Sequence, residues 1–292
     1  MQIKDNNTQI GKTIWVPATQ VNLHTHSRYC GHGTGEVADY VVSARKNGLE
    51  VLGFSEHCPV PDNRWKPTRM VYSQLPAYFS DVERAREKAG MVVLKGAECD
   101  YLPCYRSYYE DELLHRYKCD YLIGSIHFID MPDRKDVRVH YAPISAKELA
   151  QYTKQYIDLL ESGLFLFGAH PDVCGCSYLE WDREMEACSR AILEVAADLK
   201  IPLEINGNGF RRARVQTSKG LVHPYPLEPF WQLAAEYGIT VVVNSDAHAA
   251  QDVVASFDDC LALAQNCGLK VAGLEISGPD AQGSYGLRYV AQ

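Results

Sequence analysis

The sequence lacks several features that would place it in common classes of protein. It contains no apolar run of 18 residues, as a membrane-spanning helix would require. Residues 1–13 are polar and show neither the basic start, the apolar stretch nor the small-residue cleavage site of a secretory signal. We therefore expect a cytoplasmic protein with no membrane partner.

Paired cysteines and excess positive charge are also missing. No CxxC pair occurs among the ten cysteines, which argues against a thiolate zinc site. In a long chain without an export signal, we expect reduced thiols rather than disulfides. With 29 Lys and Arg against 37 Asp and Glu, the net charge of -8 disfavours a broad nucleic-acid-binding surface. An acidic protein can still contain a local phosphate pocket.

Short β-branched runs alternate with segments of helical apolar spacing. Val37, Tyr40, Val41 and Ala44 show that spacing, and Gly48 follows where the helix would end. The predicted strands are 20–23, 51–54, 91–94, 121–123, 164–167, 202–205 and 239–243. This alternation predicts a mostly parallel α/β sheet, open or closed into a barrel, with function at the carboxyl ends of the strands.

The length of 292 residues is compatible with one barrel-sized domain or with two small ones. No low-complexity linker interrupts the alternating pattern, so we favour one domain over residues 1–292 with a core at about 20–265. The longest irregular stretches, 58–72 and 206–226, are rich in Pro, Gly, Arg and Asn and are candidate substrate loops.

Histidines and carboxylates follow the predicted strands. His24 and His26 come directly after the first strand, and their i, i+2 spacing puts both imidazoles on one face of an extended chain. The further members at or after strand ends are His32, His57, Glu98, His127, His170, Asp246 and His248. Because strand ends of a barrel converge on one mouth, we expect all nine side chains to meet.

Imidazole with carboxylate is a donor set typical of Zn, Fe, Mn or Co. Nine donors exceed the roughly four to six that one ion accepts, so the set predicts two to three divalent ions. The alternative is one structural zinc with incidental histidines. Three histidines, His115, His140 and His223, lie outside the pattern and are interpreted as surface or supporting residues.

The ordered set resembles the PHP (polymerase and histidinol phosphatase) superfamily, whose signature is an HxH after the first strand and a DxH after the last core strand. Here these are His24–His26 and Asp246–His248. Segments 96–101, 120–128 and 203–206 look like the histidinol-phosphatase branch. The sequence departs from that branch at 206–212, where related enzymes usually carry a Thr or Ser and a Leu before the Arg.

The resemblance implies a distorted (β/α)7 barrel of the TIM-like PHP type with a trinuclear centre. By analogy, one ion would take His24, His26, Glu98 and Asp246, a second Glu98, His127 and His170, and a third His32, His57 and His248. Glu98, Asp246 and His248 are the residues to which we assign the catalytic role.

The implied activity is a metal-dependent phosphomonoesterase that hydrolyses L-histidinol phosphate with a metal-activated water. One rival is a PHP phosphoesterase acting on nucleotides or another small monoester or diester, for which the loop with Arg64, Trp65, Lys66 and Arg69 offers basic and aromatic side chains. Another is a metal-binding PHP module without turnover. The expected partner is a small phosphorylated substrate; the oligomeric state stays open.

Two further residues are candidates for substrate binding. Arg211 could bind phosphate through its guanidinium fork, or it could form a solvated basic face with Arg212 and Arg214. Glu56 could orient His57 or bind a substrate ammonium, or be a surface carboxylate. The cysteines near proposed ligands are interpreted as buried packing residues rather than as metal ligands: Cys30, Cys58, Cys99 and Cys174. The aromatic run 101–109 could line a pocket for an imidazole ring or form a packed loop, and we favour the packed loop.

Overall fold

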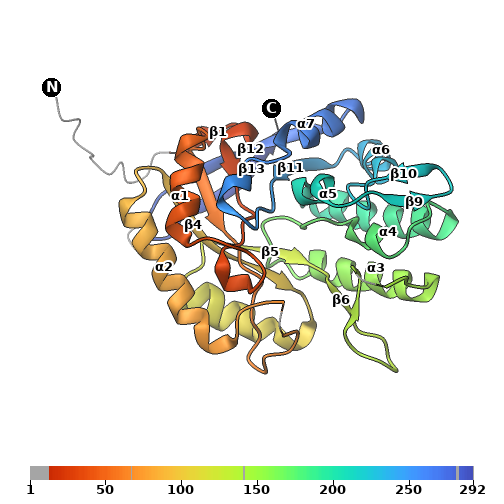
Figure 1. The fold of residues 1–292 in the computed structure, drawn as a ribbon, viewed down its shortest axis with the longest axis horizontal. Coiled ribbons are helices and arrows are strands. Elements are labelled where there is room, and N and C mark those ends of the chain that lie inside the picture. The colour runs from red at the N-terminus through yellow and green to blue at the C-terminus, as the bar shows by residue number, and fades with distance from the viewer. Residues whose placement is uncertain (1–12, 67, 141, 281–282, 292) are drawn as a thin grey trace.

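A curled sheet of parallel strands forms the centre of the molecule (Figure 1). The computed structural model describes residues 13–66, 68–140, 142–280 and 283–291. Strands β2 to β5 pair in sequence order, and β8 pairs with β11. The parallel strands are β2 (Val21–Asn22), β3 (Val51–Phe54), β4 (Val92–Asp100), β5 (Tyr121–Ser125), β8 (Leu203–Asn206) and β11 (Thr240–Asn244).

Isolated bridges complete the ring. Gly168 bridges Gly124 in β5 and Leu203 in β8, so the segment before His170 takes the place of a strand. At the opposite seam, Thr25 after β2 bridges Ala247 after β11. Seven parallel segments therefore form a distorted α/β barrel, which confirms the predicted fold class.

Helices surround the sheet in Figure 1. In α3, Ser145 and Glu148 form a reciprocal capping box at the start of the helix. The α-helices are α1 (Val37–Lys46), α2 (Leu75–Lys88), α3 (Ala146–Glu161), α4 (Arg183–Leu199), α5 (Gly207–Arg211), α6 (Glu228–Glu236) and α7 (Phe257–Asn266). The shorter or wider turns are η1 (Ala18–Gln20), η2 (Arg28–Cys30), η3 (Tyr72–Gln74), η4 (Pro103–Tyr105), η6 (Val173–Cys176), η7 (Ala250–Asp252) and the π-helix η5 (Tyr108–Arg116).

Most predicted strands are confirmed within a residue or two, but two differ from the prediction. Strand β4 continues to Asp100 because it pairs with β3 and then with β5, so Glu98 lies inside the strand rather than after it. The predicted strand 164–167 is not a regular strand. This segment makes isolated backbone hydrogen bonds to both neighbours instead of a continuous ladder. Leu166 N donates to Leu122 O of β5, and Gly168 N donates to Pro202 O just before β8.

A small antiparallel layer, not predicted from the sequence, adds to the core. It consists of β1 (Ile14–Val16), β12 (Lys270–Ser277) and β13 (Gly286–Ala291). The start of β12 also pairs parallel with β11, which joins this layer to the main sheet. Ala272, Leu274 and Ile276 of β12 are buried against the barrel interior, so apolar packing continues beyond residue 265. Two hairpins, β6 (Phe128–Ile129) with β7 (Val137–Arg138) and β9 (Val215–Thr217) with β10 (Gly220–Val222), extend from the loops after strands.

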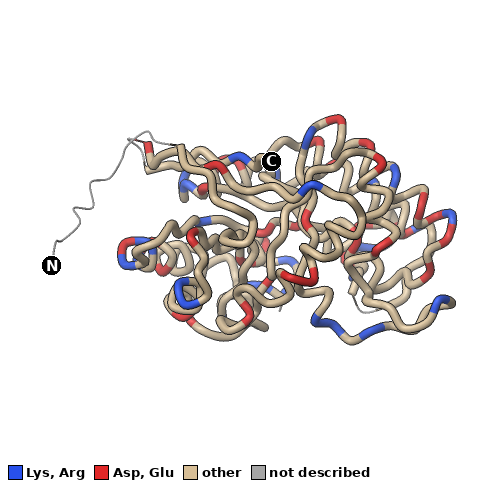
Figure 2. Tube along the Cα trace, turned by 90° about the horizontal axis from the view of Figure 1, so that it is seen from above, with Lys and Arg blue, Asp and Glu red and all other residues tan. Residues whose placement is uncertain are grey.

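Charge and apolar character agree with the composition. Figure 2 shows Asp and Glu distributed among Lys and Arg over most of the trace, in line with the net charge of -8. Among the residues that the structure describes, no helix combines the length and the apolar character that crossing a bilayer requires.

Candidate metal centre

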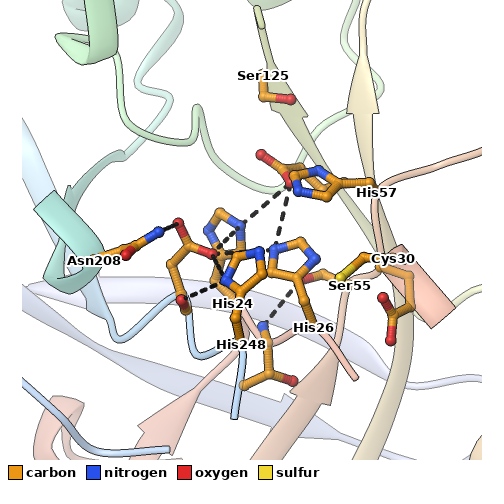
Figure 3. Close-up of polar contacts among 12 residues, drawn as sticks. His24, His26, Cys30, Ser55, His57, Ser125, Asn208 and His248 are labelled. Atoms are coloured by element: carbon orange, nitrogen blue, oxygen red, sulfur yellow. Dashed lines mark hydrogen bonds and ion pairs between the residues drawn. The ribbon is translucent and has the colours of Figure 1, made fainter. Parts of the chain in front are cut away.

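The nine side chains singled out from the sequence meet at the carboxyl ends of the parallel strands. His24 and His26 follow β2, His57 follows β3, His127 follows β5 and Asp246 follows β11. Figure 3 shows the imidazoles of His24, His26, His57 and His248 gathered in one group. The side chains of His24, His26, Glu98 and Asp246 are buried, whereas His32 is exposed at the rim.

Glu98 occupies the middle of the group. Its Oε2 lies 3.5 Å from Nε2 of both His24 and His26 and 2.6 Å from Nδ1 of His57. Its Oε1 lies 2.9 Å from Nε2 of His170 and 3.5 Å from Nε2 of His127. One carboxylate thus presents each oxygen to a different set of histidines, an arrangement that could bridge two cations.

The first set fits a tetrahedral ion. Nε2 of His24 and of His26, Oε2 of Glu98 and Oδ1 of Asp246 are buried and make no hydrogen bond. The imidazole nitrogens lie 3.6 and 3.2 Å from Asp246 Oδ1, and both lie 3.5 Å from Glu98 Oε2. Zinc–ligand distances of about 2.1 Å give a tetrahedral ligand–ligand separation of roughly 3.4 Å. The spacing and the missing hydrogen bonds both match a cation at the centre of these atoms.

On the other side of Glu98, donor atoms gather around Oε1. His127 and His170 are both part of three-residue groups with Glu98 whose donor atoms lie within 4.8 Å of one another. The third member of each group differs, being His57 with His127 and His24 with His170. The buried clusters therefore overlap, as expected for a centre that holds more than one ion.

The third expected set is arranged less simply. The ring of His32 lies 4.7 Å from that of His248 and 5.2 Å from that of His57. The donor atoms of His32 and His248 group with Cys30 Sγ, and those of His57 and His248 group with His26. Nδ1 of His57 also lies 2.6 Å from Glu98 Oε2. The thiol of Cys30 is engaged within its own loop, because it accepts a hydrogen bond from Gly33 N at 3.0 Å.

The two central carboxylates are held as anions. Burial raises the pKa of Glu98, but the neighbouring histidines, first His57, outweigh this and hold it well below its usual value. Burial also raises the pKa of Asp246, but the neighbouring histidines, chiefly His24, outweigh this and lower the pKa strongly. Burial lowers the pKa of His24, yet the carboxylates around it, first Glu204, raise it well above its ordinary value. The centre therefore concentrates negative charge that a bound cation would neutralise.

Other imidazoles in the group are kept neutral. Burial lowers the pKa of His26. It also lowers the pKa of His248 to about 4. Because metal ions bind the neutral form of imidazole, these shifts favour the ligand state at neutral pH.

Backbone strain is concentrated at the same place. His170 has a φ of 28° and Asp246 a φ of 49°, in a region that residues with a side chain rarely adopt. Strained backbone of this kind persists where the surrounding structure enforces it, and it clusters at functional sites. Here it occurs at the two turns that direct His170 and Asp246 into the barrel mouth.

Glu204 supports the centre from below, a role not assigned from the sequence. Its Oε1 lies 2.8 Å from Nδ1 of His24 and accepts a hydrogen bond from Asn244 Nδ2 at 2.9 Å. Its Oε2 accepts from Asn206 Nδ2 at 2.9 Å and from the backbone N–H of His170 at 3.1 Å. The carboxylate thus fixes the tautomer of His24, leaving Nε2 free to face Glu98 and Asp246.

Replacing Glu204 by Gln should lower metal affinity about 10–100-fold while the fold is retained, because the amide keeps the shape but not the charge opposite His24. Metal titration of the chelator-treated variant, with circular dichroism as the fold control, measures this. Unchanged affinity would show that Glu204 does not act through His24. Glu194→Gln, on an exposed position of α4, is the matched control.

Asp100 performs a similar task for His127. Its Oδ2 lies 3.0 Å from Nδ1 of His127 and accepts a hydrogen bond from Arg69 at 2.8 Å, while Oδ1 accepts from the backbone N–H of His127 at 2.5 Å. Arg69 stacks against the ring of Trp65 at 4.8 Å. Loop 58–72, a candidate substrate loop, is therefore connected to the metal centre through Arg69 and Asp100.

A cavity of about 420 Å³ opens over the centre. Its floor includes Asp246 and five of the histidines, and its walls carry three arginines together with His140, Asn208 and Tyr225. The arginines are Arg69, Arg138 and Arg212. A pocket with a buried donor cluster at one end and guanidinium groups around it suits an anionic ligand.

Arg211, predicted from the sequence as a phosphate ligand, makes its contacts away from the cavity in this structure. Its guanidinium donates to the backbone oxygens of Ala255, Ser245 and Asp246 at 3.2, 2.8 and 3.2 Å, and it does not line the cavity. Arg212, the next residue, does line it. The short helix α5 ends between the two, so consecutive side chains point in different directions.

Glu56 is neither a surface carboxylate nor a lining residue of the cavity. It is completely buried, and its Oε1 accepts hydrogen bonds from the backbone and the hydroxyl of Ser27 at 2.6 and 2.5 Å. Burial raises its pKa to about 8. Its observed contacts hold the loop after His26 in place, and its other oxygen, Oε2, is buried without a hydrogen-bond partner.

Of the three histidines outside the pattern, one lies close to the centre. His140 lines the cavity with its ring 5.0 Å from that of His127, whereas His115 is exposed on η5 and His223 lies elsewhere. The hairpin β6–β7 brings His140 there, a placement with no local signal in the sequence.

The four cysteines near the proposed ligands, Cys30, Cys58, Cys99 and Cys174, are buried and form no disulfide. In the aromatic run 101–109, Tyr101, Tyr108 and Tyr109 pack in the core.

Comparison with known proteins agrees with this geometry. The model of the PHP domain matches residues 22–208. The chain is 31% identical to the "Probable histidinol-phosphatase" of Deinococcus radiodurans over 82% of this chain and 90% of that protein. It is 25% identical to the histidinol-phosphatase of Bacillus subtilis over 79% and 94% of the two chains.

A solved structure shares the fold. The histidinol phosphate phosphatase of Lactococcus lactis, determined with zinc, L-histidinol and phosphate, aligns with a TM-score of 0.67 at 17% identity. The alignment covers 87% of this chain and 96% of that one. The family match over most of the chain and the relative at 31% identity lead to one conclusion: the chain belongs to the PHP domain family.

Proposed function

We propose that the chain is a metal-dependent phosphomonoesterase that hydrolyses L-histidinol phosphate to L-histidinol and phosphate. The observation that carries the proposal is the position of Glu98, whose two oxygens face separate groups of histidines. Three of these histidines, His57, His127 and His170, line a cavity that also carries three arginines. We infer that two to three divalent ions, Zn, Fe or Mn, bind to the nine side chains predicted from the sequence.

The donor set and the reaction fit one another. Divalent ions at such a centre lower the pKa of coordinated water and neutralise charge on phosphoryl oxygens. In this proposal Glu98 and Asp246 hold the ions, His24 and His26 complete the first site, and Glu204 keeps His24 oriented. Because uncatalysed phosphate-monoester hydrolysis is extremely slow, most of the acceleration must come from electrostatic stabilisation, which this buried cluster is built to provide.

We assign binding of the phosphate dianion to Arg212. It lines the cavity together with Asp246 and His248, and a guanidinium can bind two phosphate oxygens at once. Arg211 instead holds the backbone after β11 in place through its bonds to Ser245 and Asp246. In this assignment one arginine binds substrate and its neighbour positions a metal ligand.

The relatives and the cavity favour a small monoester over a nucleic acid. Two curated relatives are named as histidinol-phosphatases, and the structurally similar Lactococcus protein was determined with L-histidinol and phosphate. The nucleotide alternative rested on basic and aromatic side chains of loop 58–72, and two of these side chains are engaged in contacts within the chain. Arg64 pairs with Asp130 and Asp136, and the indole of Trp65 donates to Asp136 at 2.5 Å.

A substrate panel tests the proposal. With metal-loaded enzyme, kcat/KM for L-histidinol phosphate should exceed that for nucleoside monophosphates and for bis-para-nitrophenyl phosphate by at least about tenfold, the discrimination that about 1.4 kcal/mol of differential binding provides. A higher kcat/KM for the diester or for a nucleotide would overturn the substrate assignment while leaving a phosphoesterase. No turnover of any phosphate ester would instead favour a metal-binding module.

A further inference from the structure

Two side-chain amides hold the second oxygen of Asp246. Its Oδ2 accepts a hydrogen bond from Asn206 Nδ2 at 3.2 Å and another from Asn208 Nδ2 at 3.2 Å. The dashed line from Asn208 in Figure 3 marks the second of these bonds. Because an ionised carboxylate oxygen only accepts, both amides must present their NH2 group to it, which fixes their orientation. The phosphatase reaction proposed for the centre uses neither amide.

The two oxygens of Asp246 therefore have different surroundings. Oδ1 is buried and makes no hydrogen bond, and it lies 3.6 and 3.2 Å from Nε2 of His24 and of His26. Oδ2 has two lone pairs, and the two amides bind both of them. A cation among the imidazoles can therefore bind Oδ1 directly, whereas Oδ2 would have to give up a hydrogen bond to reach it.

Glu98 is also limited to one oxygen in the first set. Its Oε2 lies 3.5 Å from Nε2 of both His24 and His26. Its Oε1 faces His127 and His170 instead. The four side chains of the first set then offer one atom each to the first ion. Four single donors suit zinc, which is commonly bound by four ligands, whereas manganese is typically bound by six.

We propose that Asn208, together with Asn206, keeps Asp246 a one-oxygen ligand and so makes the first site prefer zinc over manganese. Asn208 is a positioning residue, since its amide acts through Asp246. Without this amide one lone pair of Oδ2 is free, and both oxygens of Asp246 can bind the same ion, which adds a ligand and suits manganese better. The inference rests on the proposed metal centre and names the ion that its first site takes.

Asn208 is the better of the two amides to replace. Asn206 also donates to Glu204 Oε2 at 2.9 Å, and its Oδ1 accepts from the backbone N–H of Asn208 at the start of α5. Replacing Asn206 would therefore disturb Glu204 and the helix as well as Asp246. The side chain of Asn208 is half-buried at the cavity wall, so its replacement should leave the fold intact.

Metal competition in the full chain tests the proposal. Chelator-treated protein is equilibrated with buffered zinc and manganese at less than one bound ion per chain, and elemental analysis gives the two metals. The first set should fill first, because its four donor atoms are buried and make no hydrogen bond. Asn208→Leu keeps the shape of the side chain and removes the donor. It should lower the zinc-to-manganese affinity ratio at least about tenfold, the smaller effect expected for losing a residue that orients a ligand.

The ratio separates positioning from a merely structural role. A general loosening of the site would weaken both metals by the same factor and leave the ratio unchanged. Asn208→Ala, which removes the amide without adding an apolar group to the cavity wall, should shift the ratio in the same direction. Asn266→Leu, the same substitution on an exposed position of α7, should leave the ratio unchanged.

Cobalt in place of zinc gives a second measurement, because four-coordinate cobalt absorbs visible light more strongly than six-coordinate cobalt. Asn208→Leu should lower the visible absorption per bound cobalt. The proposal is overturned if the Asn208 variants keep the metal ratio or the cobalt spectrum of the unaltered chain, or if Asn266→Leu shifts the ratio equally. Failure of the metal centre itself gives a different result, because the unaltered chain would then retain neither zinc nor manganese.

Discussion

Replacing Glu98 by Gln is expected to lower kcat by at least about a thousandfold, equivalent to about 4 kcal/mol, and to remove at least one bound ion. Five histidines approach its two oxygens, and an amide can offer only one oxygen, without charge, to this group. Because the carboxylate stands between both donor sets, its loss should affect more than one ion. Kinetics with L-histidinol phosphate and elemental analysis of the same sample measure the two effects together.

A control variant and a check of the fold show whether the effect of Glu98→Gln is specific. Glu194→Gln, which changes an exposed carboxylate on α4, should leave both metal content and kcat unchanged. The Glu98 variant should also retain its secondary structure, since the substitution preserves volume and the apolar core of the molecule does not include Glu98. Near-normal turnover with a full metal complement in folded Glu98→Gln would remove Glu98 from the centre.

The second large effect is expected for Arg212→Ala, with an increase in KM for L-histidinol phosphate of about 10–100-fold. A hydrogen bond to a charged group contributes about 1.5–3 kcal/mol, which corresponds to that range. If Arg212 binds more strongly as charge builds up on the phosphoryl oxygens, kcat falls as well, so both constants must be measured. Metal content should not change, because Arg212 contacts the cavity and not the buried donor atoms.

Arg211→Ala should behave differently from its neighbour. Losing the bonds to Ser245 and Asp246 loosens the turn that carries Asp246, so we expect weaker metal binding and lower thermal stability rather than a change confined to KM. If instead the Arg211 variant raised KM alone while the Arg212 variant behaved as the unaltered enzyme, the assignment of the phosphate ligand would revert to Arg211.

These two arginines show where inference from the sequence ends. A strand end and the residues just after it could be located from apolar patterning, and parallel strands of a barrel bring such ends together, so the convergence of His24, Glu98 and Asp246 was predictable. Their role as ligands remains a prediction. The direction of a side chain on the five-residue helix α5 depends on what α5 packs against, and no local pattern distinguishes Arg211 from Arg212.

The supporting residues were missed for a different reason. Glu204 and Asp100 lie within strands, where alternation indicates the face of the sheet but not the partner. A carboxylate between Leu203 and Ile205 is, however, a buried charge in an apolar strand, and such a charge requires a partner. That signal could have identified Glu204. His140 had no equivalent signal, because a hairpin folded back from β5 brings it to the cavity.

The most direct test of the account measures metal content and turnover of L-histidinol phosphate in one preparation, before chelation, after chelation and after reconstitution. We expect two to three divalent ions per chain, loss of turnover when they are removed and recovery of turnover in step with the second ion bound. Full turnover by a chain that retains one ion or none would contradict the proposal that a multinuclear metal centre hydrolyses the phosphate ester.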